Sequence, residues 1–475
     1  MEPHTDGHVA GREDVAYRVR AERAARGKAR RAQVPRSSQA ELSLEGRPDP
    51  IALLEEQAKT RLPELVPVRN GRMLSSPFAF FRGASLVMAA DLARTPTTGL
   101  GVQLCGDAHL VNFGCFGTPE RNLIFDLNDF DETLPGPWEW DVKRLAASFE
   151  IAGRANGLSA PERRTAVLAT VRAYREATTE LAMKPNLDVW YARLDVEALI
   201  NENHLLERTQ QKVCERMQQK AFEHDSSHAL DKLTQLVDGD RRIVSDPPLI
   251  IPLRELVGDA MSHRHEDSLR DMLATYSASL ASHRRALFGQ FRLIEAARKV
   301  VGVGSVGTRC WILLFLSVDW QAPLFLQAKQ ADPSVLERFL GASSCASHGE
   351  RVVAGQRLMQ AASDMFLGWG TAIGLDGVRR DFYVRQLRDW KGSMAVEKMN
   401  AAGLAAYGGM CGWTLARAHA RSGDRIAMSA YLGKRDVFDQ AIATFAQRYA
   451  DQNERDHQAL AQAVRAGRVA AEVGL

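Results

Sequence analysis

The chain has few cysteines and no long apolar segment. Its six cysteines, among 475 residues, form neither a Cys-x-x-Cys pair nor a metal-finger spacing, and a chain of this length does not depend on disulfide bonds for its stability. The longest apolar run, CWILLFLSV, is far shorter than the roughly 18 residues that cross a bilayer. The N-terminal residues also lack the apolar stretch of a secretion signal. We therefore expect a cytoplasmic protein without a membrane segment.

The chain also lacks a marked excess of either sign of charge. The net charge is only +3, so the chain as a whole does not carry the field that attracts nucleic acids. Residues 1–48 differ, because arginine, alanine and polar side chains dominate there and almost no large apolar side chain is available for burial. We expect this segment to be a disordered basic arm, and it is the one part for which nucleic acid stays open as a partner.

Beyond the arm, the spacing of apolar residues predicts an α+β fold with two lobes. Residues 49–290 combine short strands with a long helical insertion and form the first part of a large lobe. Residues 291–395 alternate apolar and polar side chains, as the strands of a small antiparallel sheet do, and a hinge is expected at RDWKG near their end. Residues 396–475 return to helices, which complete the large lobe.

The stretch LCGDAHLVNFG gathers polar side chains in a turn between glycines. Asp107 and Asn112 are five positions apart, which is the spacing of the catalytic base and a magnesium ligand in protein kinases. His109 has no second histidine at a spacing that would bind zinc. We expect His109 to brace the turn, and we expect Asp107 and Asn112 to carry its chemistry.

A second acidic run, LIFDLNDFDE, follows the turn and contains Asp126, Asp129 and Asp131. A calcium loop of the EF-hand type needs glycine at its sixth position, whereas a loop that starts at Asp126 has Asp131 there. Kinases carry their remaining metal-binding carboxylate at the end of a strand that follows the catalytic turn. All three aspartates are candidates for that ligand.

Gly302, Gly304 and Gly307 form a G-x-G-x-x-G pattern, which occurs in dinucleotide-binding turns and in the hairpin that covers ATP phosphates in kinases. A dinucleotide-binding turn opens a helix, but the residues that follow here, TRCWILLFL, favour a strand. A phosphate-covering hairpin also needs a lysine on the next strand, and LFLQAKQA supplies Lys329. We therefore favour the hairpin over a dinucleotide-dependent redox enzyme.

The lysine of a kinase is usually held by a glutamate on the helix that follows. Glu350 begins the helix ERVVAGQRLMQ and is our choice for this partner. It can equally be a charge favoured by the helix dipole, and Glu337 in PSVLERFL also fits. Which glutamate holds Lys329 stays open.

GDAHLVN resembles the Gly-Asp-x-His-x-x-Asn catalytic turn of aminoglycoside phosphotransferases and choline-type kinases. The resemblance implies a protein-kinase-like fold, in which Asp129 of NDFDETLPGPWEWDVKRLA is the metal ligand and Asp141 braces the turn. Cys105 departs from these families, which usually have histidine there. The order departs as well, because the glycine hairpin and Lys329 follow the turn instead of preceding it.

A circular permutation reconciles this order with a kinase-like fold. LAAYGGMCGWTLARAHARSGD resembles the helix that runs into the catalytic turn of kinases, so we expect residues 102–112 to continue it in space. Phrases such as CGDAHLVNFG, GPWEWDVKRLA and GVGSVGTRC are also similar to the bacterial family called domain of unknown function 2252. That family name implies no activity.

The resulting hypothesis is an ATP-dependent phosphotransferase. Asp107 would deprotonate the hydroxyl of an acceptor, Asn112 and Asp129 would hold Mg²⁺, and Lys329 with the glycine hairpin would bind the phosphates of ATP. The acceptor stays open, from a small alcohol, an antibiotic or a sugar to a protein side chain. Two alternatives also stay open: a nucleotide-binding pseudokinase that recruits a partner through its basic arm, and transfer of AMP from an ATP bound in the flipped orientation.

Overall fold

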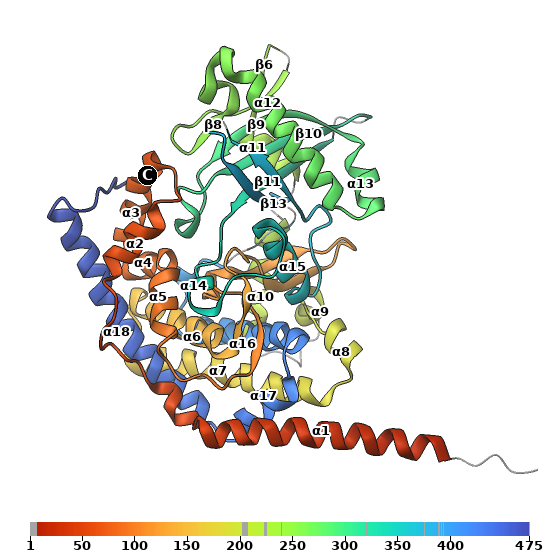
Figure 1. Cartoon of the computed structure of the whole chain (residues 1–475), viewed down its shortest axis with the longest axis vertical. Helices are drawn as coiled ribbons and strands as arrows, with labels where there is room; N and C mark the ends of the chain where they lie inside the picture. The colour runs from red at the N-terminus through yellow and green to blue at the C-terminus, as the bar shows by residue number, and fades with distance from the viewer. Residues whose placement is uncertain are drawn as a thin grey trace, which may run out of the picture.

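A six-stranded antiparallel sheet forms one end of the molecule in the computed structural model (Figure 1). The structure describes residues 7–201, 208–222, 226–238, 240–319, 322–374, 376–387, 390, 392 and 394–474. In spatial order the strands are β12 (Gly368–Ile373), β13 (Arg379–Gln386), β11 (Pro323–Ala331), β10 (Cys310–Ser317), β9 (Phe291–Lys299) and β8 (Ile250–Pro252). Every neighbouring pair is antiparallel, as predicted. Three residues of the expected hinge, Arg388, Asp389 and Lys391, lie outside the described residues.

The sheet begins before the boundary expected at residue 291. Strand β8 and the long helix α12 (Leu253–Ser279) come earlier in the chain, and Met272 and Tyr276 of α12 pack in one apolar cluster with strand residues of the sheet. Gly370 of β12 permits the close approach, since a Cβ there would lie 2.7 Å from the carbonyl oxygen of Met272. The last part of the expected helical insertion therefore covers the sheet.

Helices form the other end of the molecule (Figure 1). Glycine lets two of them approach closely, because a Cβ at Gly412 would lie 2.1 Å from the carbonyl oxygen of Thr170. The predicted helices after residue 396 are present. No helix in the described part of the chain is long and apolar enough to span a membrane. The principal helices of this end are α6 (Trp138–Ala155), α7 (Ala160–Met183), α16 (Ala401–Ser422), α17 (Arg425–Leu432) and α18 (Val437–Arg465).

Two small antiparallel sheets carry the polar turn and the acidic run. The first pairs β1 (Gly101–Leu104) with β4 (Leu134–Pro137), and the second contains β2 (Phe113–Gly117), β3 (Leu123–Leu127) and β5 (Leu194–Asp195). A hairpin of β6 (Thr234–Val237) and β7 (Asp240–Ile243) lies beside the large sheet. The remaining helices are α2 (Pro50–Ala58), α3 (Val66–Leu74), α4 (Pro77–Gly83), α5 (Ser85–Leu92), α8 (Asn186–Tyr191), α9 (Val196–Asn201), α10 (Arg208–Phe222), α11 (Ser226–Leu233), α13 (Ser282–Phe288), α14 (Glu337–Leu340) and α15 (His348–Met359), with short 3-10 turns that include η4 (Val303–Ser305).

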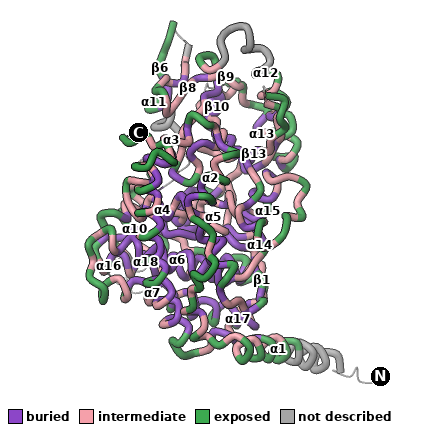
Figure 2. Tube along the Cα trace, turned by 60° about the vertical axis from the view of Figure 1, so that its left-hand side comes forward, coloured by how far each residue is buried: buried purple, intermediate pink, exposed green. Residues whose placement is uncertain are grey.

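The N-terminal segment is helical and not disordered. Helix α1 (Gly7–Gln33) runs along the base of the molecule beside α17, and its surface in Figure 2 is largely exposed where it is described. Arg23 Nε donates to Asp424 Oδ1 at 2.8 Å, and Arg31 Nε donates to the carbonyl oxygen of Tyr431 at 2.8 Å. The prediction of a disordered arm is wrong over this helix, because arginine heads bonded to another helix replace the missing apolar contacts. Residues 1–6 lie outside the described residues.

Candidate functional site

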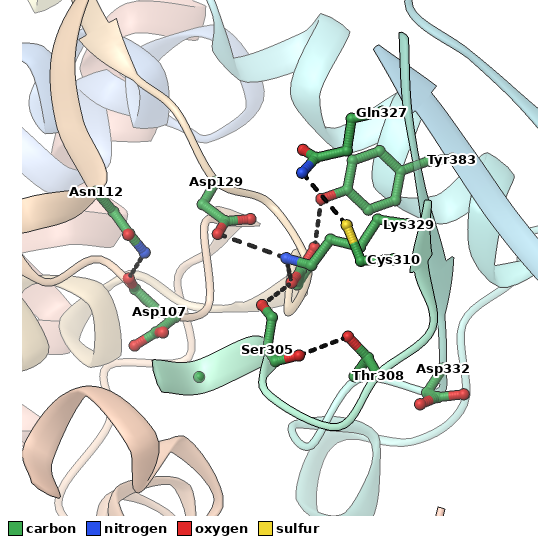
Figure 3. A network of polar contacts seen from close by, with 12 residues as sticks. Asp107, Asn112, Asp129, Ser305, Thr308, Cys310, Gln327, Lys329, Asp332 and Tyr383 are labelled. Atoms are coloured by element: carbon green, nitrogen blue, oxygen red, sulfur yellow. Dashed lines mark hydrogen bonds and ion pairs between the residues drawn. The ribbon is translucent and has the colours of Figure 1, made fainter. Parts of the chain in front are cut away.

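A polar cleft lies where the large sheet meets the polar turn. Both parts of the molecule contribute to it, and Figure 3 shows side chains from the two sides pointing toward one another. The cleft is lined by Arg82, Ser85, Asp107, His109, Asn112, Asp129, Asp131, Glu132, Val301, Gly302, Gly304, Ser305, Gln327, Lys329 and Arg385. Every residue predicted for the site lies here except Gly307, at the end of the glycine turn, and Glu350.

Lys329 reaches the acidic run from the middle of the large sheet. It lies on β11, between β10 and β13, and is 3% exposed. Its Nζ is 3.8 Å from Asp129 Oδ2 and donates a hydrogen bond to Asp131 Oδ2, although Lys329 and Asp131 are 198 residues apart in the chain (Figure 3). Burial alone would lower the pKa of Lys329, but the two carboxylates raise it well above its usual range. The ammonium is therefore held in its charged form.

The three aspartates of the acidic run have different surroundings. Asp126 is buried and accepts bonds from Arg417 and from two backbone amides. Asp131 accepts bonds from Lys329 and from the hydroxyls of a tyrosine and a serine. Asp129 Oδ1 is buried and has no hydrogen-bond partner among the described residues. Of the three carboxylates, Asp129 is the one that keeps an oxygen without a hydrogen-bond partner among the described residues.

The polar turn is held by Asn112 and by Arg144, which the sequence did not single out. Asn112 Nδ2 donates to the carbonyl oxygen of Asp107 at 2.7 Å, which closes the turn on itself. Arg144 Nε donates to Asp107 Oδ1 at 2.7 Å, so the carboxylate is fixed by a buried guanidinium. His109 Nε2 is 3.7 Å from Asp107 Oδ2, and burial lowers the pKa of His109 to about 3, so that the ring is neutral. His109 is buried in the turn, and its Nδ1 has no hydrogen-bond partner among the described residues, so a bracing role for this ring stays a prediction.

Asp141 ties the turn to helix α6. Its Oδ2 accepts the backbone N–H of Cys105 at 2.7 Å, and its Oδ1 accepts that of Gly106 at 3.0 Å. His419 of α16 adds a third contact, with Nε2 at 3.2 Å from Asp141 Oδ2. This is the bracing role expected for Asp141. Arg144 lies three positions after Asp141 and thus on the same face of the helix. The expected role of Asp141 could therefore have pointed to Arg144 as a second residue beside the turn.

The glycine pattern forms a turn between two strands. Strand β10 follows Gly307, as predicted, so the glycines do not open an α-helix and the requirement of a dinucleotide-binding turn is not met. Gly307 has a φ of +89°, a conformation that favours glycine. Arg61 Nη2 donates to the carbonyl oxygen of Gly304 at 2.9 Å, and Ser305 Oγ donates to Asp131 Oδ2 at 3.3 Å. The glycine turn is thus held by one hydrogen bond to Arg61 and one to the acidic run.

Glu350 does not hold Lys329, and that prediction is wrong. Its carboxylate accepts the backbone N–H of Ala346 at 3.1 Å, at the start of α15. The lysine is paired instead with the acidic run, because Asp129 and Asp131 on the loop after β3 lie beside its ammonium group. The alternative, Glu337, lies 3.7 Å from Arg351 Nε through its Oε1. Helix α15 supports the site through this arginine, whose Nη2 donates to the carbonyl oxygen of Asp131 at 2.9 Å.

Comparisons with known proteins identify the family. No curated protein and no solved structure matches the chain. The family model described as an uncharacterized protein conserved in bacteria (DUF2252) matches residues 61–463, which include the turn, the acidic run, the glycine turn and Lys329. The chain therefore belongs to the DUF2252 family of bacterial proteins.

Proposed function

We propose that this protein is an ATP-dependent phosphotransferase with a circularly permuted, kinase-like arrangement of its two lobes. Asp107 deprotonates the acceptor hydroxyl, Asn112 and Asp129 hold Mg²⁺, and Lys329 with the glycine turn binds the phosphates of ATP. Phosphoryl transfer depends on positioning and charge neutralisation more than on covalent chemistry, and the cleft offers both.

The contact between Lys329 and the acidic run is the observation on which this proposal rests. A buried lysine beside two aspartates is costly unless each charge has a partner, and the chain brings these groups together from distant segments. The glycine turn lies over the same cleft, with Gly302 and Gly304 in its lining. A lysine, a glycine turn and a metal-binding carboxylate in one cleft are the parts that phosphoryl transfer uses.

The residues present fit a magnesium ion. The described part of the chain has no group of three His, Cys, Asp or Glu side chains that could hold a metal by themselves. Magnesium, however, usually binds one or two protein oxygens together with phosphate oxygens and water. Asp129 offers a buried oxygen without a partner. Asn112 lines the same cleft, and its backbone carbonyl oxygen accepts the N–H of Asn128, the residue before Asp129, at 2.8 Å. A bound ion would neutralise charge on the phosphates.

The end of helix α16 supports the permutation. Ser422, its last residue, accepts the backbone N–H of Gln103 in β1 at 2.9 Å through its Oγ. A Cβ at Gly423 would lie 3.2 Å from the carbonyl oxygen of Gly101. Helix α16 therefore ends where β1 begins, so β1 and the turn continue this helix in space as they would follow it in the chain of a kinase.

The test is Mg²⁺-dependent ATP binding and turnover by the purified protein. We expect ATP to raise the thermal midpoint with Mg²⁺ and to do so far less without it, by linkage of binding to stability. Asp129→Ala should lose the Mg²⁺-dependent part of the shift, whereas Asp188→Ala, an exposed aspartate on α8, should keep it. Wild-type protein with neither binding nor turnover, together with an unchanged Asp129→Ala, would overturn the proposal.

The same experiment separates the two alternatives. Binding of ATP without formation of ADP or AMP is the result expected of a nucleotide-binding scaffold. Release of pyrophosphate and an AMP adduct in the mass of the product is the result expected of AMP transfer. Formation of ADP with a phosphorylated product is the result expected of the phosphotransferase.

A further inference from the structure

Arg82 is a cation of the cleft without a partner. It is half-buried in helix α4, its Nε is enclosed, and no hydrogen bond or ion pair engages its guanidinium among the described residues. Its neighbours differ, since Arg61 donates to the glycine turn, Arg144 to Asp107 and Arg351 to the acidic run. A guanidinium facing a polar cleft with its donors unused points to an anionic ligand.

The guanidinium lies beside the glycine turn, in the cleft that Asp107 also lines. A Cβ at Gly302 would be 3.8 Å from Arg82 Nη2. The backbone of the preceding residue is linked to the polar turn, because the carbonyl oxygen of Phe81 accepts Arg144 Nη2 at 3.0 Å and Arg144 holds Asp107. Burial lowers the pKa of Arg82, while the charge of Asp107 raises it. The arginine thus faces the space that separates the nucleotide-covering turn from the base.

We propose that Arg82 is a catalytic residue that binds the phosphoryl group while it is transferred. This rests on the proposed function. In the transfer step the acceptor oxygen bonds to the γ-phosphorus, the bond from that phosphorus to the β–γ bridging oxygen breaks, and ADP leaves with the electron pair. The acceptor proton passes to Asp107. Negative charge is spread over the phosphoryl oxygens at that moment, and an arginine supplied by the same chain stabilises it.

The location of Arg82 favours the transferring group over other anions. The α- and β-phosphates would lie under the glycine turn near Lys329, where cationic charge is already present. The transferring group must pass from there toward Asp107, through the space that Arg82 faces. Its planar fork of donors matches phosphoryl oxygens, which a lysine at the same position would bind less well. Helix α4 precedes the polar turn in this chain. Arg82 therefore belongs to neither the polar turn nor the glycine turn.

The first test compares binding of a transition-state mimic with binding of product. MgADP with aluminium fluoride imitates the transferring group, and it needs no knowledge of the acceptor. Arg82→Ala should weaken binding of MgADP–aluminium fluoride by about a hundredfold or more, and binding of MgADP alone by less than about threefold. Arg94→Gln, which changes an exposed arginine in the turn after α5, is the control and should change neither. Equal loss for both ligands, or loss for neither, would overturn the proposal.

The second test is turnover of MgATP with water or an added acceptor. Arg82→Ala should lower kcat by about a thousandfold with little change in KM for ATP. Free guanidinium should restore part of the rate of Arg82→Ala, which a lost packing contact would not allow, and Arg82→Lys should recover only part of it. A kcat within threefold of wild type in Arg82→Ala refutes the assignment. Wild-type protein that binds no MgATP refutes instead the function on which it rests.

Discussion

Removing the charge of Lys329 and of Asp131, singly and together, tests the contact on which the cleft depends. Truncating one partner of a buried ion pair typically costs about 3–5 kcal/mol, because the other charge is left buried without compensation. The side chain of Lys329 is 4% exposed, whereas that of Asp131 is 29% exposed, so water offsets part of the cost at the carboxylate. We therefore expect about 3 kcal/mol for Lys329→Met and about 2 kcal/mol for Asp131→Asn.

The double variant gives the decisive number. If the two groups touch, Lys329→Met with Asp131→Asn should cost less than the sum of the single variants, by a coupling free energy of about 2 kcal/mol. Amide hydrogen exchange in β10 and β11 reports the opening free energy of this part of the molecule. Arg338 and Glu56, an exposed ion pair, serve as the control cycle and should give a coupling below about 1 kcal/mol. Additive costs for Lys329 and Asp131 would show that the pair does not form.

Two further predictions concern the turn. Asp141→Ala leaves two backbone N–H groups without their charged acceptor, so it should reduce the free energy of unfolding by about 3–5 kcal/mol in urea titrations. Asp141→Asn keeps one acceptor oxygen and should lose about half as much, and equal losses would contradict the hydrogen bonds described. His109 has a folded pKa of about 3 against 6.5 when exposed, so unfolding takes up a proton between these values. The stability that this neutral ring contributes is present above pH 6.5 and is lost as the pH falls toward 3, with a slope of up to about 1.4 kcal/mol per pH unit. His109→Gln should remove that part of the slope in urea titrations from pH 7 to 4, the exposed His283→Gln should keep it, and parallel curves for His109→Gln and wild type would contradict the burial of a neutral ring.

The amino-acid sequence by itself determined the local features of this protein. The five-residue spacing of Asp107 and Asn112, the strand after Gly307 and the lysine on the following strand are all read from neighbouring residues. The alternation of side chains in a strand and the residue types of a turn involve only neighbouring residues, so both can be recognised in the sequence without knowledge of the rest of the chain. The small antiparallel sheet, apart from its strand β8, and the C-terminal helices could be predicted for the same reason.

Only the tertiary structure decided which groups meet. The partner of Lys329 was expected on the next helix, but it lies in the acidic run. The loop after β3 places Asp131 against the lysine, whereas Glu350 bonds the backbone at the start of its own helix. The same holds for Arg82, which no spacing in the sequence connects with Asp107. Contacts between segments far apart leave no period in a single sequence, and an arginine in a helix reads the same whether it faces water or a cleft. Which of the three aspartates keeps an oxygen without a hydrogen-bond partner therefore depended on how the two ends of the molecule come together.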